Sequence, residues 1–266
     1  MSLSRAVVLT LVVCTAPLAA QRTKAKPAAP AKKPVAPQAN VLTSAERAAG
    51  WRLLFDGKSL RGWRGLGYDD VPSAHWKVVD GAIKKVATAD VANTSNGKPA
   101  SGGDLITVDK FDDFELAFQW KVTRGANGGV KYNVSEELSL RNNSTHSAIG
   151  FEYQVQDDSL GEDVAVPSHR AGSLFDLEAP NYEKRLEPVG EWNTSRVLFR
   201  GKHIEHWLNG AMVLEFDLGT PETDLSLAKS KYRSISGFAS PRRGHIALQD
   251  HGDEVYYRSI KIREIK

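Results

Sequence analysis

Three stretches of the 266-residue chain alternate apolar side chains with carboxylate, amide, imidazole or ammonium groups. Their polar members are Lys131 and Asn133, then Glu152, Gln154 and Gln156, and finally His245, Gln249 and His251. Because successive side chains of a β-strand point to opposite faces, each polar set is expected to share one face of a sheet. Planar carboxylate and amide groups suit the recognition of sugar hydroxyls. Three such rows on one concave sheet predict a carbohydrate groove.

The same rows also fit the solvated outer face of an ordinary β-sandwich, which is the alternative interpretation. Solvated strand faces usually carry Lys, Glu, Thr and Ser, whereas these rows are rich in Gln, Asn and His. The residue types of the three rows together therefore favour a binding face.

Short strands are the elements that would position these rows. Further strands are predicted at Phe114–Trp120, Arg196–Arg200, His203–Leu208, Met212–Phe216 and Val255–Ile265. The Asn209-Gly210 pair tolerates the positive φ angles of a two-residue turn, so the three strands between residues 196 and 216 form a predicted meander. Residues 224–229 form at most a turn or two of helix. About ten to twelve short strands predict a single all-β sandwich.

The charge distribution argues against a nucleic-acid partner. Residues 1–40 contain six Lys or Arg and no Asp or Glu, so residues 41–266 hold 29 basic and 32 acidic side chains. A mildly acidic domain does not offer a surface that follows phosphates. Residues 21–50 are rich in Ala, Pro and Lys, which predicts a linker before a domain at residues 51–266.

The first 20 residues have the order of an export signal: Arg5, the apolar run Ala6–Val13, and the small residues Ala16–Ala20. The apolar run is too short for a membrane span. We therefore expect a periplasmic or secreted protein. Leu11–Cys14 also resembles a lipobox, so a lipid anchor on Cys14 is the alternative. Because Cys14 is the single cysteine, disulfides and a cysteine nucleophile are excluded for the mature domain.

A set of motifs in a fixed order identifies a family resemblance over most of the domain, from Trp51 to Ile265. The motifs are Leu54–Trp63, Trp76–Gly81, Gly103–Thr107, Phe114–Leu116, Asn127–Gly129, Glu152–Asp157, Gly190–Asn193, His206–Gly210 and Leu248–Gly252. Together they resemble the 3-keto-disaccharide hydrolase family, which implies a concanavalin-like jelly-roll sandwich. Two departures are visible, because the family usually has Asn-Ser-Gly at residues 127–129 and Tyr at Phe175. Loss of the Ser hydroxyl is expected to alter substrate contacts.

The resemblance implies cleavage of a glycoside that carries a ketone at C3. The ketone acidifies the C2 proton, so a base can remove it and the enolate can expel the aglycone from C1. Glu152 and His251 are the predicted acid and base, in an order that stays open, and Lys131 is the predicted enolate-stabilising cation. The predicted hydroxyl-binding residues are Asn127, Gln154, Asp157, His206 and Gln249. Asp157 shares the face of Glu152 only if a bulge intervenes.

No cofactor is expected, because another enzyme would make the ketone and the chain has no Gly-rich βαβ fingerprint. His203 and His206 are three residues apart, which puts them on opposite faces of a strand, so no transition-metal site is predicted. Structural calcium stays open.

Two other classes of function also stay open. One is a conventional glycosidase with two carboxylates in the Glu152–Asp157 motif. The other is a non-catalytic, lectin-like carbohydrate-binding module, because the same fold serves both purposes. The sequence leaves the glycoside, its anomer, its linkage and the oligomeric state undetermined.

Overall fold

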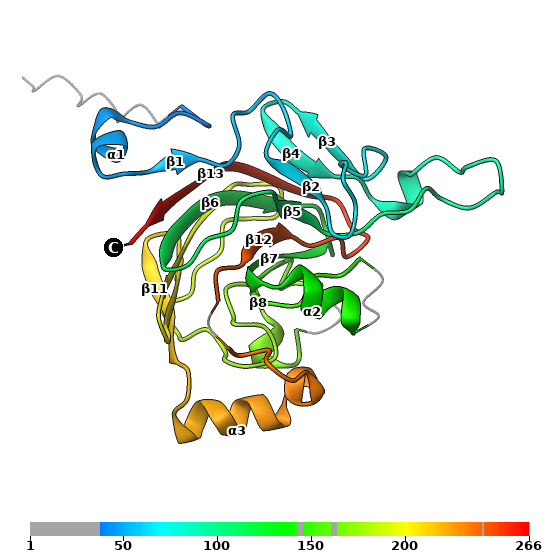
Figure 1. Cartoon of the computed structure of the whole chain (residues 1–266). Helices are drawn as coiled ribbons and strands as arrows, with labels where there is room; N and C mark the ends of the chain where they lie inside the picture. Colours follow the sequence, from blue (N-terminus) through cyan, green and yellow to red (C-terminus); the bar gives the residue numbers. More distant parts are fainter. Residues whose placement is uncertain (1–37, 143–145, 161–163, 241, 266) are drawn as a thin grey trace, which may run out of the picture. The chain divides into compact units, whose positions relative to one another are not determined.

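The computed structural model describes residues 38–142, 146–160, 164–240 and 242–265. The predicted export signal, Cys14 and the first part of the predicted linker lie outside the described residues. Within the described ranges the chain forms two antiparallel sheets with short helices in the connections (Figure 1). The all-β sandwich predicted from the strand patterns is confirmed.

The larger sheet has eight strands in the described residues, and seven of them follow the order β11-β10-β9-β6-β13-β4-β3, while β1 pairs with β13. The bounds are β1 (Arg52–Leu53), β3 (Trp76–Val79), β4 (Ala82–Lys85), β6 (Phe114–Val122), β9 (Asn193–Arg200), β10 (His203–Leu208), β11 (Ala211–Asp217) and β13 (Val255–Glu264). The predicted meander is the β9-β10-β11 ribbon. Asn209 and Gly210 both have positive φ in its last turn, as the sequence predicts.

The smaller sheet has five strands in the described residues, in the order β2-β5-β12-β7-β8. Their bounds are β2 (Trp63–Gly65), β5 (Leu105–Thr107), β7 (Asn127–Val134), β8 (Phe151–Gln156) and β12 (His245–Leu248). Strands β7 and β8 pair without a register shift from Asn127 opposite Gln156 to Tyr132 opposite Phe151. Figure 1 shows β13 and β6 arching over β12 and β7.

The helices are short and lie in the connections. They are α1 (Ser44–Ala48), α2 (Glu136–Arg141) and α3 (Pro221–Lys229), with 3₁₀ turns at η1 (Thr88–Asp90), η2 (Pro167–His169) and η3 (Lys231–Ser234). Both α1 and α3 begin with a capping box, in which the side chains of the first turn bond the free backbone N–H groups. The sequence analysis missed α2, which Ser135 caps by accepting a hydrogen bond from Leu138 N.

The core lies between the two sheets. The apolar members of the alternating rows that belong to it include Val130, Tyr132, Phe151, Tyr153 and Leu248, as predicted. The alternation fails at the end of β7, because Asn133 has a φ of 54° and changes the phase of the strand.

Val134 consequently lies in a separate small apolar cluster with Ala247, Ala148, Leu66 and Ile106. The alternating pattern predicts Val134 in the central core, and the structure places it outside that core.

Part of the predicted linker contacts the sandwich. Asn40 donates a hydrogen bond to the Gly81 carbonyl over 2.8 Å and accepts one from Ser259 N over 2.7 Å. Lys261 of β13 pairs with Glu46 of α1. No helix in the described ranges is both long and apolar enough to cross a membrane.

Candidate active site

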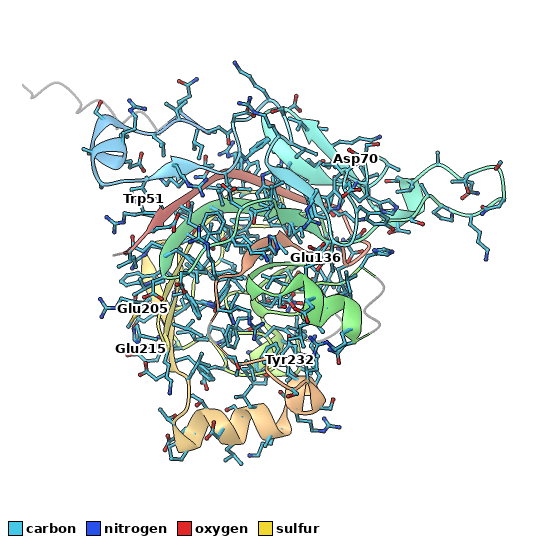
Figure 2. All side chains as sticks on the ribbon, viewed as in Figure 1. Trp51, Asp70, Glu136, Glu205, Glu215 and Tyr232 are labelled. Carbon is cyan, nitrogen blue, oxygen red and sulfur yellow. The ribbon has the colours of Figure 1, made fainter. Side chains whose placement is uncertain are left out.

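The outer face of the smaller sheet, away from the core, carries the predicted polar rows. It is buried, because the exposed fraction is 3% for Lys131, 2% for Glu152 and 1% for Gln154. The alternative interpretation as a solvated face is therefore wrong for these three residues. Residues 231–235, which include Tyr232 (Figure 2), cover part of this face.

A pocket of about 400 Å³ opens between the sheet and its cover. Its lining residues are Lys131, Asn142, Ser147, Ala148, Ile149, Glu152, Lys231, Tyr232, Ser234, Ile235 and Gln249. The pocket thus brings together Lys131 of β7, Glu152 of β8 and Gln249, which directly follows β12. The sheet register explains this meeting, because Lys131 is the cross-strand partner of both Glu152 and Ala247.

Glu152 has one buried oxygen that no described residue satisfies. Oε1 is buried and has no hydrogen-bond partner among the described residues. Burial raises the pKa of this carboxyl group, and the neighbouring positive charge of Lys131 offsets part of the rise. A buried carboxyl with a raised pKa and an open oxygen is suited to proton transfer.

Gly129 makes room for this carboxyl group. A Cβ atom at position 129 would overlap Glu152 Oε1, so any larger residue would push the carboxyl out of place. A Cβ at the neighbouring Gly128 would instead lie 2.9 Å from the Tyr257 hydroxyl and 3.2 Å from Val255, on the core side. The expected effect of the missing Ser hydroxyl on substrate contacts is therefore not supported, because position 128 faces away from the pocket.

Lys131 is held by a carboxylate that the sequence analysis did not select. Its Nζ donates to Asp104 Oδ2 over 2.9 Å and to Ser147 Oγ over 3.3 Å. Burial by itself would lower the pKa of Lys131, but the charges of Asp104 and Glu152 outweigh it and raise the pKa above its usual value. Lys131 is consequently an ammonium ion in the pocket wall.

A chain of polar side chains lies on the same rows, beyond the residues that line the pocket. Gln154 Nε2 donates to Asn127 Oδ1 over 3.0 Å, and Asn127 Nδ2 lies 3.4 Å from His251 Nε2. The His251 side chain is 46% exposed, and its Nδ1 lies 3.8 Å from Asp253 Oδ2. The structure therefore links Asn127, Gln154 and His251 by hydrogen bonds, with His251 as the exposed member.

Two predicted site residues lie elsewhere. His206 of β10 is fully buried, with Nε2 2.8 Å from the Tyr132 hydroxyl and Nδ1 3.1 Å from the Gly172 carbonyl. Burial lowers its pKa to about 4, so the ring is neutral. His206 therefore links the two sheets, and its burial between them contradicts the predicted hydroxyl-binding role.

Asp157 lies just beyond β8, and no bulge turns it towards Glu152. Its carboxylate accepts hydrogen bonds from Gly125 N over 2.8 Å and from the backbone and hydroxyl of Ser159. These bonds fix a turn at the end of the sheet, so the structure does not bring Asp157 into the pocket.

The sequence analysis missed Asp104, Ser147, Lys231 and Tyr232. Asp104 belongs to one of the family motifs, which was the available signal, whereas the other three lie in irregular connections without a periodic pattern. A further missed segment lies along the edge of β8, where Phe175 N donates to the Glu152 carbonyl over 3.0 Å.

The described residues contain no group of three or more His, Cys, Asp or Glu side chains arranged to hold a metal ion. That the reaction needs no cofactor stays a prediction, and structural calcium stays open.

Comparisons with known proteins agree with this architecture. Residues 50–263 match the family described as the 3-keto-alpha-glucoside-1,2-lyase-like domain. A Bacteroides thetaiotaomicron protein named 3-keto-disaccharide hydrolase is 34% identical over 241 residues, which cover 81% of this chain and 79% of that protein.

Two solved structures of candidate glycosyl hydrolases from Parabacteroides distasonis share the fold. The first has a TM-score of 0.73 at 28% identity and covers 86% of this chain and 100% of its own. The second has a TM-score of 0.60 at 26% identity and covers 81% of this chain and 99% of its own. The concanavalin-like jelly-roll fold expected from the motifs is confirmed. The chain belongs to the family of 3-keto-alpha-glucoside-1,2-lyase-like domains.

Proposed function

We propose that this protein cleaves 3-keto-glycosides by removing the C2 proton and expelling the aglycone from C1. One observation carries the proposal: the buried Glu152 carboxyl, with its open oxygen, lines the same pocket as the Lys131 ammonium. A base beside a fixed positive charge is what enolate formation next to a ketone requires.

The bond changes follow from the position of the ketone. Glu152 takes the C2 proton, and the electrons of the C2–H bond form the enolate between C2 and C3. Reformation of the C3 carbonyl then creates a C1–C2 double bond and breaks the bond from C1 to the aglycone oxygen. Addition of water across that double bond gives the free 3-keto sugar, and without this addition the unsaturated sugar is the product.

Lys131 and His251 supply the remaining groups in this proposal. The ammonium of Lys131 stabilises the negative charge that develops on the C3 oxygen. His251 is the candidate acid that protonates the departing oxygen, because its more exposed position suits a leaving group that points out of the pocket. The structure thus favours Glu152 as the base, a choice that the sequence left open.

Buried acceptor atoms favour a polyhydroxylated ligand, and two of the three belong to residues that line the pocket, Glu152 and Gln249. Glu152 Oε1, Gln154 Oε1 and Gln249 Oε1 have no hydrogen-bond partner among the described residues. A buried acceptor without a donor costs about 1–3 kcal/mol, so a ligand that brings hydroxyl donors gains by satisfying it. A sugar ring presents such donors on several adjacent carbons.

A conventional glycosidase fits less well. That mechanism needs a second free carboxyl group about 5–10 Å from the first. Among the described residues that line the pocket, Glu152 is the one carboxylate. Asp104 lies behind Lys131 and uses both oxygens, with Oδ1 accepting from Asp250 N and Oδ2 from Lys131 and Ala148 N.

The proposed function is tested by a substrate panel. Purified protein is incubated with 3-keto-glycosides and with the unoxidised parent glycosides, and release of the aglycone is measured. We expect release from the keto substrates alone. Equal release from the parents would overturn the proposal, and no release from either set would favour the carbohydrate-binding module.

We also propose that the protein is exported, as the order of charged, apolar and small residues before position 21 predicts. Intact-mass analysis of protein from its native host should show the loss of about 20 residues. Loss of about 13 residues with a lipid on Cys14 would indicate the anchored alternative. Full-length protein in the cytoplasm would contradict both.

A further inference from the structure

Two lysine–carboxylate pairs lie next to each other behind the pocket. In the first, Lys131 contacts Asp104 over 2.9 Å, and both side chains are at most 4% exposed. In the second, Lys85 contacts Asp250 Oδ1 over 2.8 Å, with side chains that are 1% and 9% exposed. The pairs are joined because Asp250 N donates to Asp104 Oδ1 over 2.8 Å.

Asp104 is fixed before any substrate binds. Its Oδ2 accepts hydrogen bonds from Ala148 N over 2.8 Å and from Lys131, while Oδ1 accepts from Asp250 N. These donors come from β7, from the segment before β8 and from the segment after β12. The carboxylate therefore has a single orientation relative to three parts of the site.

We propose that Asp104 is a positioning residue for the reaction: it anchors the Lys131 ammonium in the pocket wall and keeps it charged. This inference rests on the proposed function, in which Lys131 stabilises the enolate. Asp104 itself touches no substrate, because its oxygens are occupied by Lys131 and by backbone N–H groups. Its effect on the reaction passes through Lys131.

The charged groups around Lys131 determine what removal of Asp104 does. Asp104 faces it from the start of β5, and Glu152 faces it from β8, while Lys231 and Tyr232 line the pocket from the covering segment. Asp250 lies next to Asp104. Without the Asp104 charge, burial dominates and lowers the pKa of Lys131, because a desolvated ammonium loses its proton more readily.

The first test is the pH dependence of kcat on a 3-keto-glycoside. In Asp104→Asn we expect kcat to fall, and the alkaline limb of the profile to move to lower pH by at least about one unit, since the required ammonium now loses its proton earlier. Asp104→Glu keeps the charge but displaces it, so kcat should fall while the alkaline limb stays. Glu254→Gln, which removes the Lys84–Glu254 pair on the other sheet, is the matched control and should change neither.

The second test needs no substrate. Lysine labelled with ¹³C at the ε carbon reports the charge of Nζ by NMR, and the Lys131 signal is assigned by its loss in Lys131→Arg. We expect this signal to titrate at lower pH in Asp104→Asn than in the unsubstituted protein. Identical titration in both proteins would overturn the inference.

The two tests separate failure of the inference from failure of the proposed function. If the protein cleaves no 3-keto-glycoside while the NMR titration shifts as expected, the proposed function fails and the charge-holding role of Asp104 stands. If the protein cleaves the substrate but Asp104→Asn changes neither kcat nor the alkaline limb, Asp104 is not a positioning residue. Should Asp104→Asn not fold, as judged by circular dichroism, Asp104→Ser is measured in its place with the same expected shift.

Discussion

The outer faces of the two sheets have the same period-two alternation, but their carboxylates differ in burial and in ion pairing. On the larger sheet, Glu115 pairs with Arg196 over 3.1 Å and with Arg263 over 2.6 Å, and these side chains remain partly exposed. On the smaller sheet, Glu152 is buried beneath a cover, and one of its oxygens has no hydrogen-bond partner in the part of the chain that the structure describes. Glu205 and Glu215, labelled in Figure 2, belong to the larger sheet, whereas Tyr232 belongs to the cover of the smaller one.

This difference shows at which carboxylate the protein has a lower folding stability in exchange for a reactive group. A paired, half-exposed charge costs little and contributes little. A buried carboxyl with an unsatisfied oxygen destabilises the fold, and such a group is retained where it performs a reaction. The alternating pattern alone does not distinguish these cases; burial by the covering segment does.

The largest expected effect comes from the same substitution on the two faces. Glu152→Gln should lower kcat on a 3-keto-glycoside by about 10²–10⁴-fold, because the amide cannot accept the C2 proton. Glu115→Gln should leave kcat unchanged. Steady-state rates of both variants are measured. A similar loss of kcat in both would mean that the buried Glu152 has no role in the reaction that the exposed Glu115 lacks.

Two neighbouring glycines sharpen the comparison within one strand. Gly129→Ala should lower kcat/KM by roughly 10²-fold, because the new Cβ displaces the Glu152 carboxyl and small misplacements of a reacting group have effects of that size. Gly128→Ala points into the core, so it should lower Tm, at a cost of about 1–3 kcal/mol, and largely spare kcat/KM. If Gly129→Ala retains full activity, Glu152 does not need the position in which the structure holds it.

A smaller effect concerns stability and its dependence on pH. The pKa of Glu152 is raised on folding, so its carboxyl favours the folded state below its unfolded pKa of about 4.5 and this advantage is lost as the pH rises through the folded pKa. Glu152→Gln should therefore be more stable than the unsubstituted protein at pH 7, by on the order of 1 kcal/mol, because the amide has no charge to desolvate. The difference should shrink as the pH falls to 4.5 and below. Thermal unfolding at several pH values measures it, and a less stable variant at pH 7 would contradict the account.

The smallest effect belongs to the exposed pairs. Glu115→Gln should cost no more than about 1 kcal/mol, and the cost should decrease in high salt because screening weakens exposed ion pairs. Denaturant titration at two salt concentrations gives the result. A loss above about 2 kcal/mol would mean that the two faces do not differ in the way proposed here.

The sequence predicted the sandwich and the rows of the site because both depend on a period of two. Lys131 and Glu152 meet for that reason, since a regular register carries the alternation from one strand to the next. The same rule places His206 on the core face, because it alternates in phase with the buried Ile204 and Leu208. That signal was available and was not used.

Other features were not accessible from periodicity. Asp104 lies at the end of a loop before β5, and its meeting with Lys131 depends on the pairing of β5 with β12 and of β12 with β7. The covering segment, residues 231–235, has no repeating pattern that would show which face it covers. Asn133 changes the phase of β7 through one backbone angle, which composition does not reveal.

The most direct test of the central claim is the fate of the C2 proton. Single-turnover release of the aglycone is compared for a 3-keto-glycoside with hydrogen or deuterium at C2, and the deuterium content of the unreacted substrate is followed in parallel. If Glu152 removes the C2 proton, release is slower from the deuterated substrate or its deuterium is lost in an enzyme-dependent way, and neither effect occurs when Glu152 is replaced by Gln. Equal release rates with full retention of deuterium at C2 would contradict proton removal by Glu152 as the way in which this pocket breaks the glycosidic bond.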